Sequence, residues 1–182
     1  MKRNVFTAAG IVLLAIYWYL VLAVTGGTPT NFLIIKDFSV SADLSLVPFR
    51  DLLAILGGND FGGSFLQIGG NVILFAPLGF LVPFFWQGWR GAGRTIALGC
   101  AMSLFIEINQ LFNYRATSVD DLILNTLGAA AGFACFLVGK RLFHLPGRAG
   151  ARAEKLPVVV LLIVWALAIA RELPLYLSYL SL

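Results

Sequence analysis

The sequence predicts an all-α membrane protein, a polytopic bundle of about five transmembrane helices. Of its 182 residues, 59% are hydrophobic and only 12% are charged, and the mean hydropathy is +0.89. Soluble domains are typically about 45–50% apolar and about 25% charged, so this composition does not suit a water-facing surface. Five apolar runs approach the roughly 20 residues that a helix needs to cross the hydrocarbon core. We therefore expect one transmembrane domain over residues 1–182.

The first apolar run, Val5–Val24, is interpreted as an uncleaved first helix. A signal peptide is the alternative, but its apolar part is usually only about 7–15 residues long. The mixed segment that follows contains Pro48–Leu56, which is either a short helix in the membrane interface or a loop helix that covers the bundle end. The remaining runs are Phe65–Trp86, Thr95–Phe112, Leu122–Phe143 and Pro157–Tyr176.

Lys and Arg residues fall unevenly on the segments between these runs. One set of alternate segments holds nine of the 13 basic residues and the other holds four. Because basic loops stay in the cytoplasm, this count predicts a cytoplasmic N-terminus and an extracytoplasmic C-terminus. The net charge of +4 is then explained by cytoplasmic loops, and we expect no nucleic-acid partner.

With this orientation, polar residues from three different helices share one depth near the outer face. The positions that we expect to bind a ligand there are Asn71, Glu107, Gln110, Arg115, Asp120, Asp121 and Asn125. The depth agreement is independent of the orientation count, which used only Lys and Arg. The sequence therefore predicts a polar cluster at the extracytoplasmic end of the bundle.

Residue spacing predicts how these helices pack. Ser103, Glu107 and Gln110 recur at helical spacing and share one face. Gly128 and Gly132 form a small-xxx-small pair, which permits close approach of helices. We expect the third and fourth runs to form a tight hairpin, with their polar faces turned inward together with Asn71.

Glu107 is the residue that most needs a partner. An acidic side chain within a spanning helix costs about 2.5–3.5 kcal/mol on insertion scales, so it must pair, be protonated or face water. Arg115 and Arg171 are its candidate partners. One interpretation is a structural network that fixes helix packing, and the other is a pocket open to the outside. In an enzyme, Glu107 or Asp120 would be the acid–base group and Arg115 the anion clamp.

Several chemistries have little support in the sequence. The only histidine, His144, lies in a basic loop, so we expect no metal site and no cofactor. Cys100 and Cys135 are interpreted as small buried hydrophobes. Asp120 and Asp121 could hold a divalent cation, but an acidic pair is also favoured at a helix N-terminus by the helix dipole.

The sequence resembles the VanZ-like membrane proteins in three ordered blocks, Asn71–Phe80, Ser103–Gln110 and Arg115–Gly128, and at Val47-Pro48-Phe49. The resemblance spans roughly residues 46–137. The first and last helices match only as generic spans. Family signature positions correspond here to Asn71, Phe75, Pro77, Gly79, Glu107, Gln110, Arg115, Asp120, Asn125 and Gly128.

This resemblance implies a bacterial inner-membrane protein of the cell envelope. The family is named after a member that gives low-level resistance to the glycopeptide teicoplanin, although a housekeeping envelope role is at least as compatible with this chain. Our leading hypothesis is binding of a lipid headgroup, a lipid-linked envelope precursor or a glycopeptide-type amphiphile in the outer polar pocket. The alternatives are an enzyme that modifies envelope lipids and, third, a small transporter or flippase.

Overall fold

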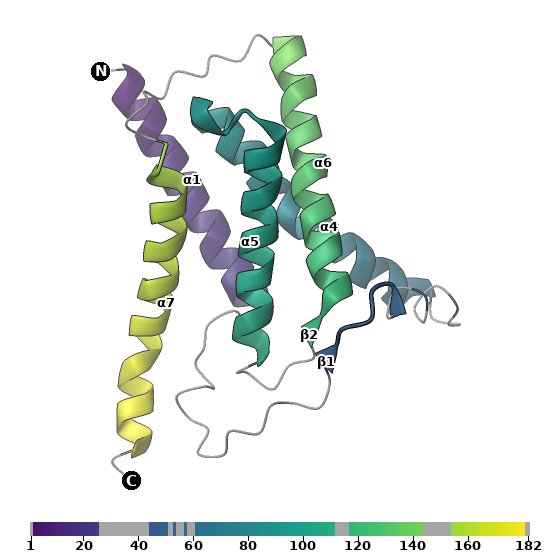
Figure 1. Ribbon diagram of the computed structural model, residues 1–182. Helices are drawn as coiled ribbons and strands as arrows, with labels where there is room; N and C mark the ends of the chain where they lie inside the picture. Colours follow the sequence, from purple (N-terminus) through teal and green to yellow (C-terminus); the bar gives the residue numbers. More distant parts are fainter. Residues whose placement is uncertain are drawn as a thin grey trace.

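The computed structural model describes residues 2–25, 44–50, 53, 57, 61–111, 117–143 and 154–180 (Figure 1). Its long helices are α1 (Lys2–Thr25), α4 (Phe61–Phe85), α5 (Ala92–Leu111), α6 (Val119–Phe143) and α7 (Leu156–Leu180). The short elements are the 3-10 helix η1 (Gln87–Trp89) and the two-residue strands β1 (Leu44–Ser45) and β2 (Thr117–Ser118). These elements confirm the predicted all-α bundle of five helices.

Each predicted apolar run coincides with one of these helices. Within the described residues, three helices are long and apolar enough to cross a membrane, over Asn4–Thr25, Gln67–Phe85 and Val119–Leu142. The apolar stretch of α7, Leu156–Arg171, is shorter. Helix α5 has 20 residues, about the length that spans the hydrocarbon core, but its second half carries several polar side chains. Most of the segment Pro48–Leu56 lies outside the described residues, so its predicted interfacial helix stays a prediction.

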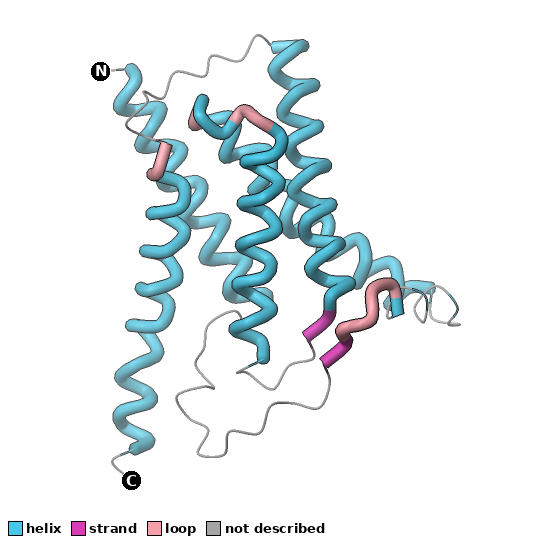
Figure 2. Tube along the Cα trace, viewed as in Figure 1, coloured by secondary structure: helices cyan, strands magenta, loops and turns pink. Residues whose placement is uncertain are grey.

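Helix α6 packs against both α4 and α5, and its larger contact is with α4. Figure 1 shows α4 passing obliquely behind α5 and α6, while α1 packs beside α7 and also contacts α4. The tube in Figure 2 shows the two strands together at the start of α6. They pair in parallel, with Leu44 opposite Thr117 and Ser45 opposite Ser118.

Glycines bring α4 and α6 into backbone contact. A Cβ atom added at Gly132 would lie 1.8 Å from the Ala76 carbonyl oxygen, and one at Gly128 would lie 2.3 Å from that of Val72. The reciprocal position on α4, Gly79, faces the Ala129 carbonyl oxygen at 1.9 Å. The close approach that Gly128 and Gly132 permit is thus made to the second run, while the predicted packing of the third run on the fourth is also present, with Gly99 of α5 against Ala129 of α6.

The buried core lies between α1, α4, α5 and α7. Its largest fully buried side chains include Trp18, Phe75, Trp86, Ile106 and Leu161. The first helix belongs to this core, and the Tyr17 hydroxyl donates to the Leu74 carbonyl oxygen (2.8 Å), one turn from Pro77 of α4. This bond joins the first helix to α4.

The cysteines differ from the expectation of buried thiols. Cys135 is exposed on α6, and Cys100 is intermediate. In an apolar helix, an exposed cysteine suits a lipid-facing surface as well as the exposed leucines around it do. The prediction failed because core-facing and lipid-facing positions of such a helix are both apolar.

Candidate functional site

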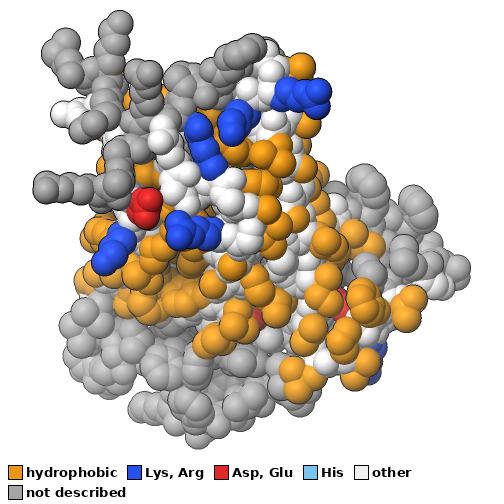
Figure 3. All heavy atoms as spheres, turned by 45° about the horizontal axis from the view of Figure 1, so that its top comes forward, with side chains coloured by type: hydrophobic (Ala, Val, Ile, Leu, Met, Phe, Trp, Pro, Cys, Tyr) orange, Lys and Arg blue, Asp and Glu red, His pale blue; other side chains and the backbone are white. Residues whose placement is uncertain are grey.

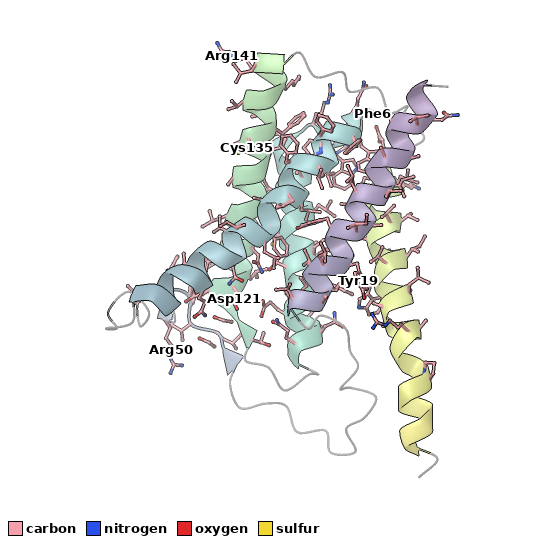
Figure 4. The ribbon with its side chains drawn as sticks, turned by 180° about the vertical axis from the view of Figure 1, so that it is seen from behind. Phe6, Tyr19, Arg50, Asp121, Cys135 and Arg141 are labelled. Carbon is pink, nitrogen blue, oxygen red and sulfur yellow. The ribbon has the colours of Figure 1, made fainter. Side chains whose placement is uncertain are left out.

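The polar residues gather at one end of the bundle, where α5 ends and α6 begins. We call this region the polar end and define it by Asn71, Glu107, Gln110, Asp120, Asp121 and Asn125. Figure 4 shows the labelled Asp121 and Arg50 near this end, with Arg141 at the opposite end. Glu107, Asp120 and Asn125 are buried. These side chains on α4, α5 and α6 thus lie at the same end of the bundle.

Glu107 anchors the start of α6. One of its carboxylate oxygens, Oε2, accepts a hydrogen bond from the Ser118 backbone amide (3.2 Å). Its own carbonyl oxygen, near the end of α5, accepts from the Thr117 hydroxyl (3.4 Å). A buried acidic group requires polar partners of this kind, since an unpaired one is strongly destabilising. Glu107 thereby joins α5 to β2.

Ser118 and Asp120 organise the first turn of α6. The Ser118 hydroxyl accepts from the Asp120 amide (3.2 Å), as a helix N-cap does, and both aspartates lie in the first turn, where the helix dipole favours them. Asp120 also accepts from the Phe49 amide (2.5 Å). Phe49 has a φ of 66°, a left-handed conformation that is strained for a bulky residue. Asp120 therefore holds a strained turn against the bundle.

Two further pairs connect α6 to its neighbours. The Asn71 side-chain amide donates to Asp121 (2.5 Å), joining α4 to α6. Deeper in the bundle, the Asn125 amide donates to the Ser103 hydroxyl (2.9 Å), joining α6 to α5. This second pair confirms that the third and fourth runs lie side by side with inward polar faces.

Gln110 belongs to the same end but faces another neighbour. Its amide donates to the Thr25 carbonyl oxygen at the end of α1 (3.0 Å). Arg171, a predicted partner of Glu107, instead donates to the Tyr19 hydroxyl, so that prediction was wrong. Arg171 on α7 can reach the Tyr19 hydroxyl on α1 because the two helices are direct neighbours. Arg115, the other predicted partner, lies outside the described residues.

Beside Glu107 is a pocket of about 220 Å³, which we call the carboxylate pocket. Most of its walls are apolar side chains from α5, α6 and the chain after β1, and Glu107 is its acidic residue. Its lining is Ser45, Leu46, Leu104, Glu107, Ile108, Thr117, Ser118, Val119 and Leu122. Leu46, Leu104 and Ile108 are among the exposed hydrophobic residues, so the pocket lies next to the apolar outer surface of the bundle.

Some features of this end are missing from the sequence prediction. The pairing of β1 with β2 brings Ser45 and Leu46 to the pocket, and two-residue strands leave no alternating pattern to detect. Three buried oxygens, Ser45 Oγ, Gln110 Oε1 and Asn125 Oδ1, make no hydrogen bond with any described residue.

The long apolar helices and the many exposed leucine, isoleucine and valine side chains define a helical membrane protein. The chain matches the VanZ/LLP1 family over residues 10–143, which is most of its length, and it therefore belongs to that family. This match runs from within α1 to the end of α6 and includes every residue of the polar end. Searches of characterised proteins and of solved structures each found no match.

Proposed function

We propose that this protein is a multi-pass protein of the bacterial cytoplasmic membrane whose polar end binds an amphiphile of the cell envelope. The observation that carries the proposal is Glu107, a buried carboxylate in the wall of an otherwise largely apolar pocket. An amphiphile has the matching chemistry, because its chain suits the apolar walls and its headgroup can donate hydrogen bonds to the carboxylate.

The charges at this end favour a headgroup rich in hydrogen-bond donors. Glu107, Asp120 and Asp121 lie close together, and Glu107 and Asp121 interact electrostatically. Amines, amides and sugar hydroxyls would be attracted to these carboxylates. Such groups occur in phospholipid headgroups, in lipid-linked envelope precursors and in lipoglycopeptides. A link to glycopeptide resistance, including teicoplanin resistance, would follow if the last of these is bound.

The orientation proposal rests on the opposite end of the bundle. The described basic residues there include Arg90, Arg94, Lys140, Arg141 and Lys155, and α1 begins at the same end with Lys2 and Arg3; we call this region the basic end. Because Lys and Arg concentrate on the cytoplasmic side, the polar end would face outward. Five crossings would then leave the N-terminus in the cytoplasm and the C-terminus outside.

Binding suits these carboxylates better than acid–base catalysis. A catalytic carboxyl must exchange a proton with its substrate. Glu107 and Asp120 instead accept hydrogen bonds from the backbone amides of Ser118 and Phe49. A transporter is supported less, because the polar cluster lies at one end of the bundle and does not line a path through it.

The test compares purified variants for binding of three probes in detergent: phosphatidylethanolamine, a lipid-linked peptidoglycan precursor and teicoplanin. Glu107→Gln keeps an acceptor for the Ser118 amide but removes the charge, and Leu104→Trp fills the carboxylate pocket. Glu107→Gln should weaken binding of the preferred probe about tenfold or more, since hydrogen bonds to charged groups are worth about 1.5–3 kcal/mol. Leu104→Trp should weaken it by a similar factor, because the indole occupies the space of the ligand. The probe that binds distinguishes the three sources of headgroup.

Tyr17→Phe is the matched control, because it removes a hydrogen bond between α1 and α4 without touching the polar end or the pocket lining. It should lower stability and leave binding by the folded protein unchanged. If Glu107→Gln and Arg115→Ala both bind like the wild type while Gly128→Leu prevents folding, the polar end is a structural network and the proposal fails.

A further inference from the structure

A second hollow lies at the basic end, between the starts of α5 and α7. This basic-end cleft has a volume of about 660 Å³, and Trp89 of η1 is part of its lining. The Trp89 indole donates to the Glu154 carbonyl oxygen (2.7 Å), which ties the turn before α7 to η1. Figure 3 shows Lys and Arg side chains over this end of the molecule, with apolar side chains next to them. The cleft is separate from the polar end and lies at the other end of the bundle.

The two helices line the cleft with the same order of residue types, a cation followed by apolar residues. On α5 the lining residues are Arg94, Ala97 and Leu98, and on the α7 side they are Lys155, Val158 and Val159. In each case a cation is followed at the third and fourth positions by apolar residues, which places all three on one helix face. The cleft therefore has two cations at its mouth and aliphatic walls further into the bundle.

The depth of the seam between α5 and α7 matches one leaflet of a bilayer. The helices meet again at Phe105 and Trp165, whose ring centroids are 4.9 Å apart in an edge-to-face arrangement. At a rise of 1.5 Å per residue, this ring pair lies about 15 Å from Arg94 and Lys155. Half of the hydrocarbon thickness is also about 15 Å. An acyl chain that starts at the cations would thus end near the aromatic pair.

The cations are positioned for an anion. The Arg94 guanidinium donates through Nη1 to the Gly88 carbonyl oxygen (3.0 Å), which fixes it at the mouth while its other nitrogens stay available. Lys155 is exposed. Glu154 also lines the cleft, but its carboxylate packs against Gly88, where an added Cβ atom would lie 2.6 Å from Oε1. With Arg90, Lys140 and Arg141 at the same end, the field around the mouth is positive.

We propose that the basic-end cleft binds one anionic phospholipid, with its phosphate between Arg94 and Lys155. One acyl chain lies along Ala97, Leu98, Val158 and Val159. The ligand follows from charge complementarity at the mouth and aliphatic walls below it, and beyond the cleft the two helices run on for about one leaflet to the Phe105–Trp165 pair. Basic pockets between membrane helices are a known way to hold anionic headgroups. The proposal does not rest on the function proposed for the polar end.

The test is native mass spectrometry of the full-length chain in detergent, titrated with dioleoyl phosphatidylglycerol or dioleoyl phosphatidylcholine. The wild type should retain one phosphatidylglycerol molecule and bind phosphatidylcholine at least tenfold more weakly. The double variant R94Q/K155Q should bind phosphatidylglycerol more weakly by roughly fivefold for each cation removed. Val159→Trp should reduce binding with both cations in place, because it fills the cleft.

The control is K140Q/R141Q, which removes the same charge from the same end but from the last turn of α6, outside the cleft lining. It should bind phosphatidylglycerol like the wild type. Equal losses in the two double variants would mean general attraction to a basic surface and would overturn the proposal. Equal binding of the two lipids by the wild type, or no retained lipid, would also overturn it. Thermal unfolding of each variant confirms that the binding results come from folded protein.

Discussion

Ser118 supports the polar end through both its backbone and its side chain. Its amide donates to Glu107, and its hydroxyl accepts from the Asp120 amide at the start of α6. The two contributions are separable, because a substitution removes the hydroxyl and keeps the amide. Residues of this kind connect a helix cap to a candidate binding site, so the stability of the cap and the geometry of the site are coupled.

We predict that Ser118→Ala lowers the free energy of unfolding by about 1 kcal/mol, whereas Ser118→Gly lowers it by only a few tenths, as is usual at an N-cap. The Glu107 contact is made by the backbone and persists in both variants. The measurement is reversible unfolding in mixed micelles, with circular dichroism as the signal. Equal losses for alanine and glycine would show that the hydroxyl does not act as a cap.

The site residues that the sequence identifies are those whose type is unusual for their surroundings. Glu107, Asn71 and Asn125 stand out because polar groups within apolar helices need a reason. Their partners are less visible, since Glu107 and Asp120 accept from the backbone amides of Ser118 and Phe49. Every residue except proline carries a backbone amide, so no side-chain pattern indicates which one a carboxylate will bind.

At the scale of helices, the contact between α4 and α6 depends on glycine. Backbone atoms of one helix occupy the space that a side chain would need at Gly79, Gly128 and Gly132 on the other. The sequence shows that a close approach exists, because small residues recur at four-residue spacing. It does not show which helix approaches, because a glycine stripe is equally complementary to any smooth neighbouring surface.

We predict that Gly132→Ala destabilises the bundle by about 1–3 kcal/mol, the usual cost of overpacking, because its methyl group must displace the Ala76 backbone. Gly70→Ala in α4 is the matched control, since nothing lies within 4 Å of its added Cβ atom. It should be neutral or stabilise by up to about 1 kcal/mol through helix propensity. The same micelle unfolding assay measures both. Similar losses at the two positions would contradict the backbone contact between α4 and α6.

Helix limits follow from the sequence to within a few residues, and the differences have a physical cause. The predicted run Leu122–Phe143 begins where the apolar residues begin, whereas α6 starts at Val119. The intervening Asp120 and Asp121 are polar but occupy the first helical turn, where acidic groups are favoured. A search for apolar runs therefore shortens helices at the ends where their caps lie.

At the scale of the whole molecule, charge and polarity divide the bundle into two chemically different ends. Glu107, Asp120 and Asp121 lie at one end together with Arg50, and most of the described basic residues lie at the other end together with Glu154. Each end has a hollow that matches its charge: the carboxylate pocket beside Glu107 and the larger cleft beside Arg94 and Lys155. The two proposals thus concern opposite faces of a membrane, and the orientation of the chain decides which ligands can reach each hollow.

The proposed orientation predicts which positions a membrane-impermeant maleimide can label in right-side-out vesicles. In a chain with Cys100 and Cys135 replaced by alanine, Arg50→Cys at the polar end should react at once. Lys140→Cys and Lys155→Cys at the basic end should react only after the vesicles are permeabilised. All three residues are exposed in the structure, so access to the side chain does not limit labelling. The reverse pattern would place the polar end in the cytoplasm, which would exclude an extracytoplasmic amphiphile while leaving the fold and the basic-end cleft unchanged.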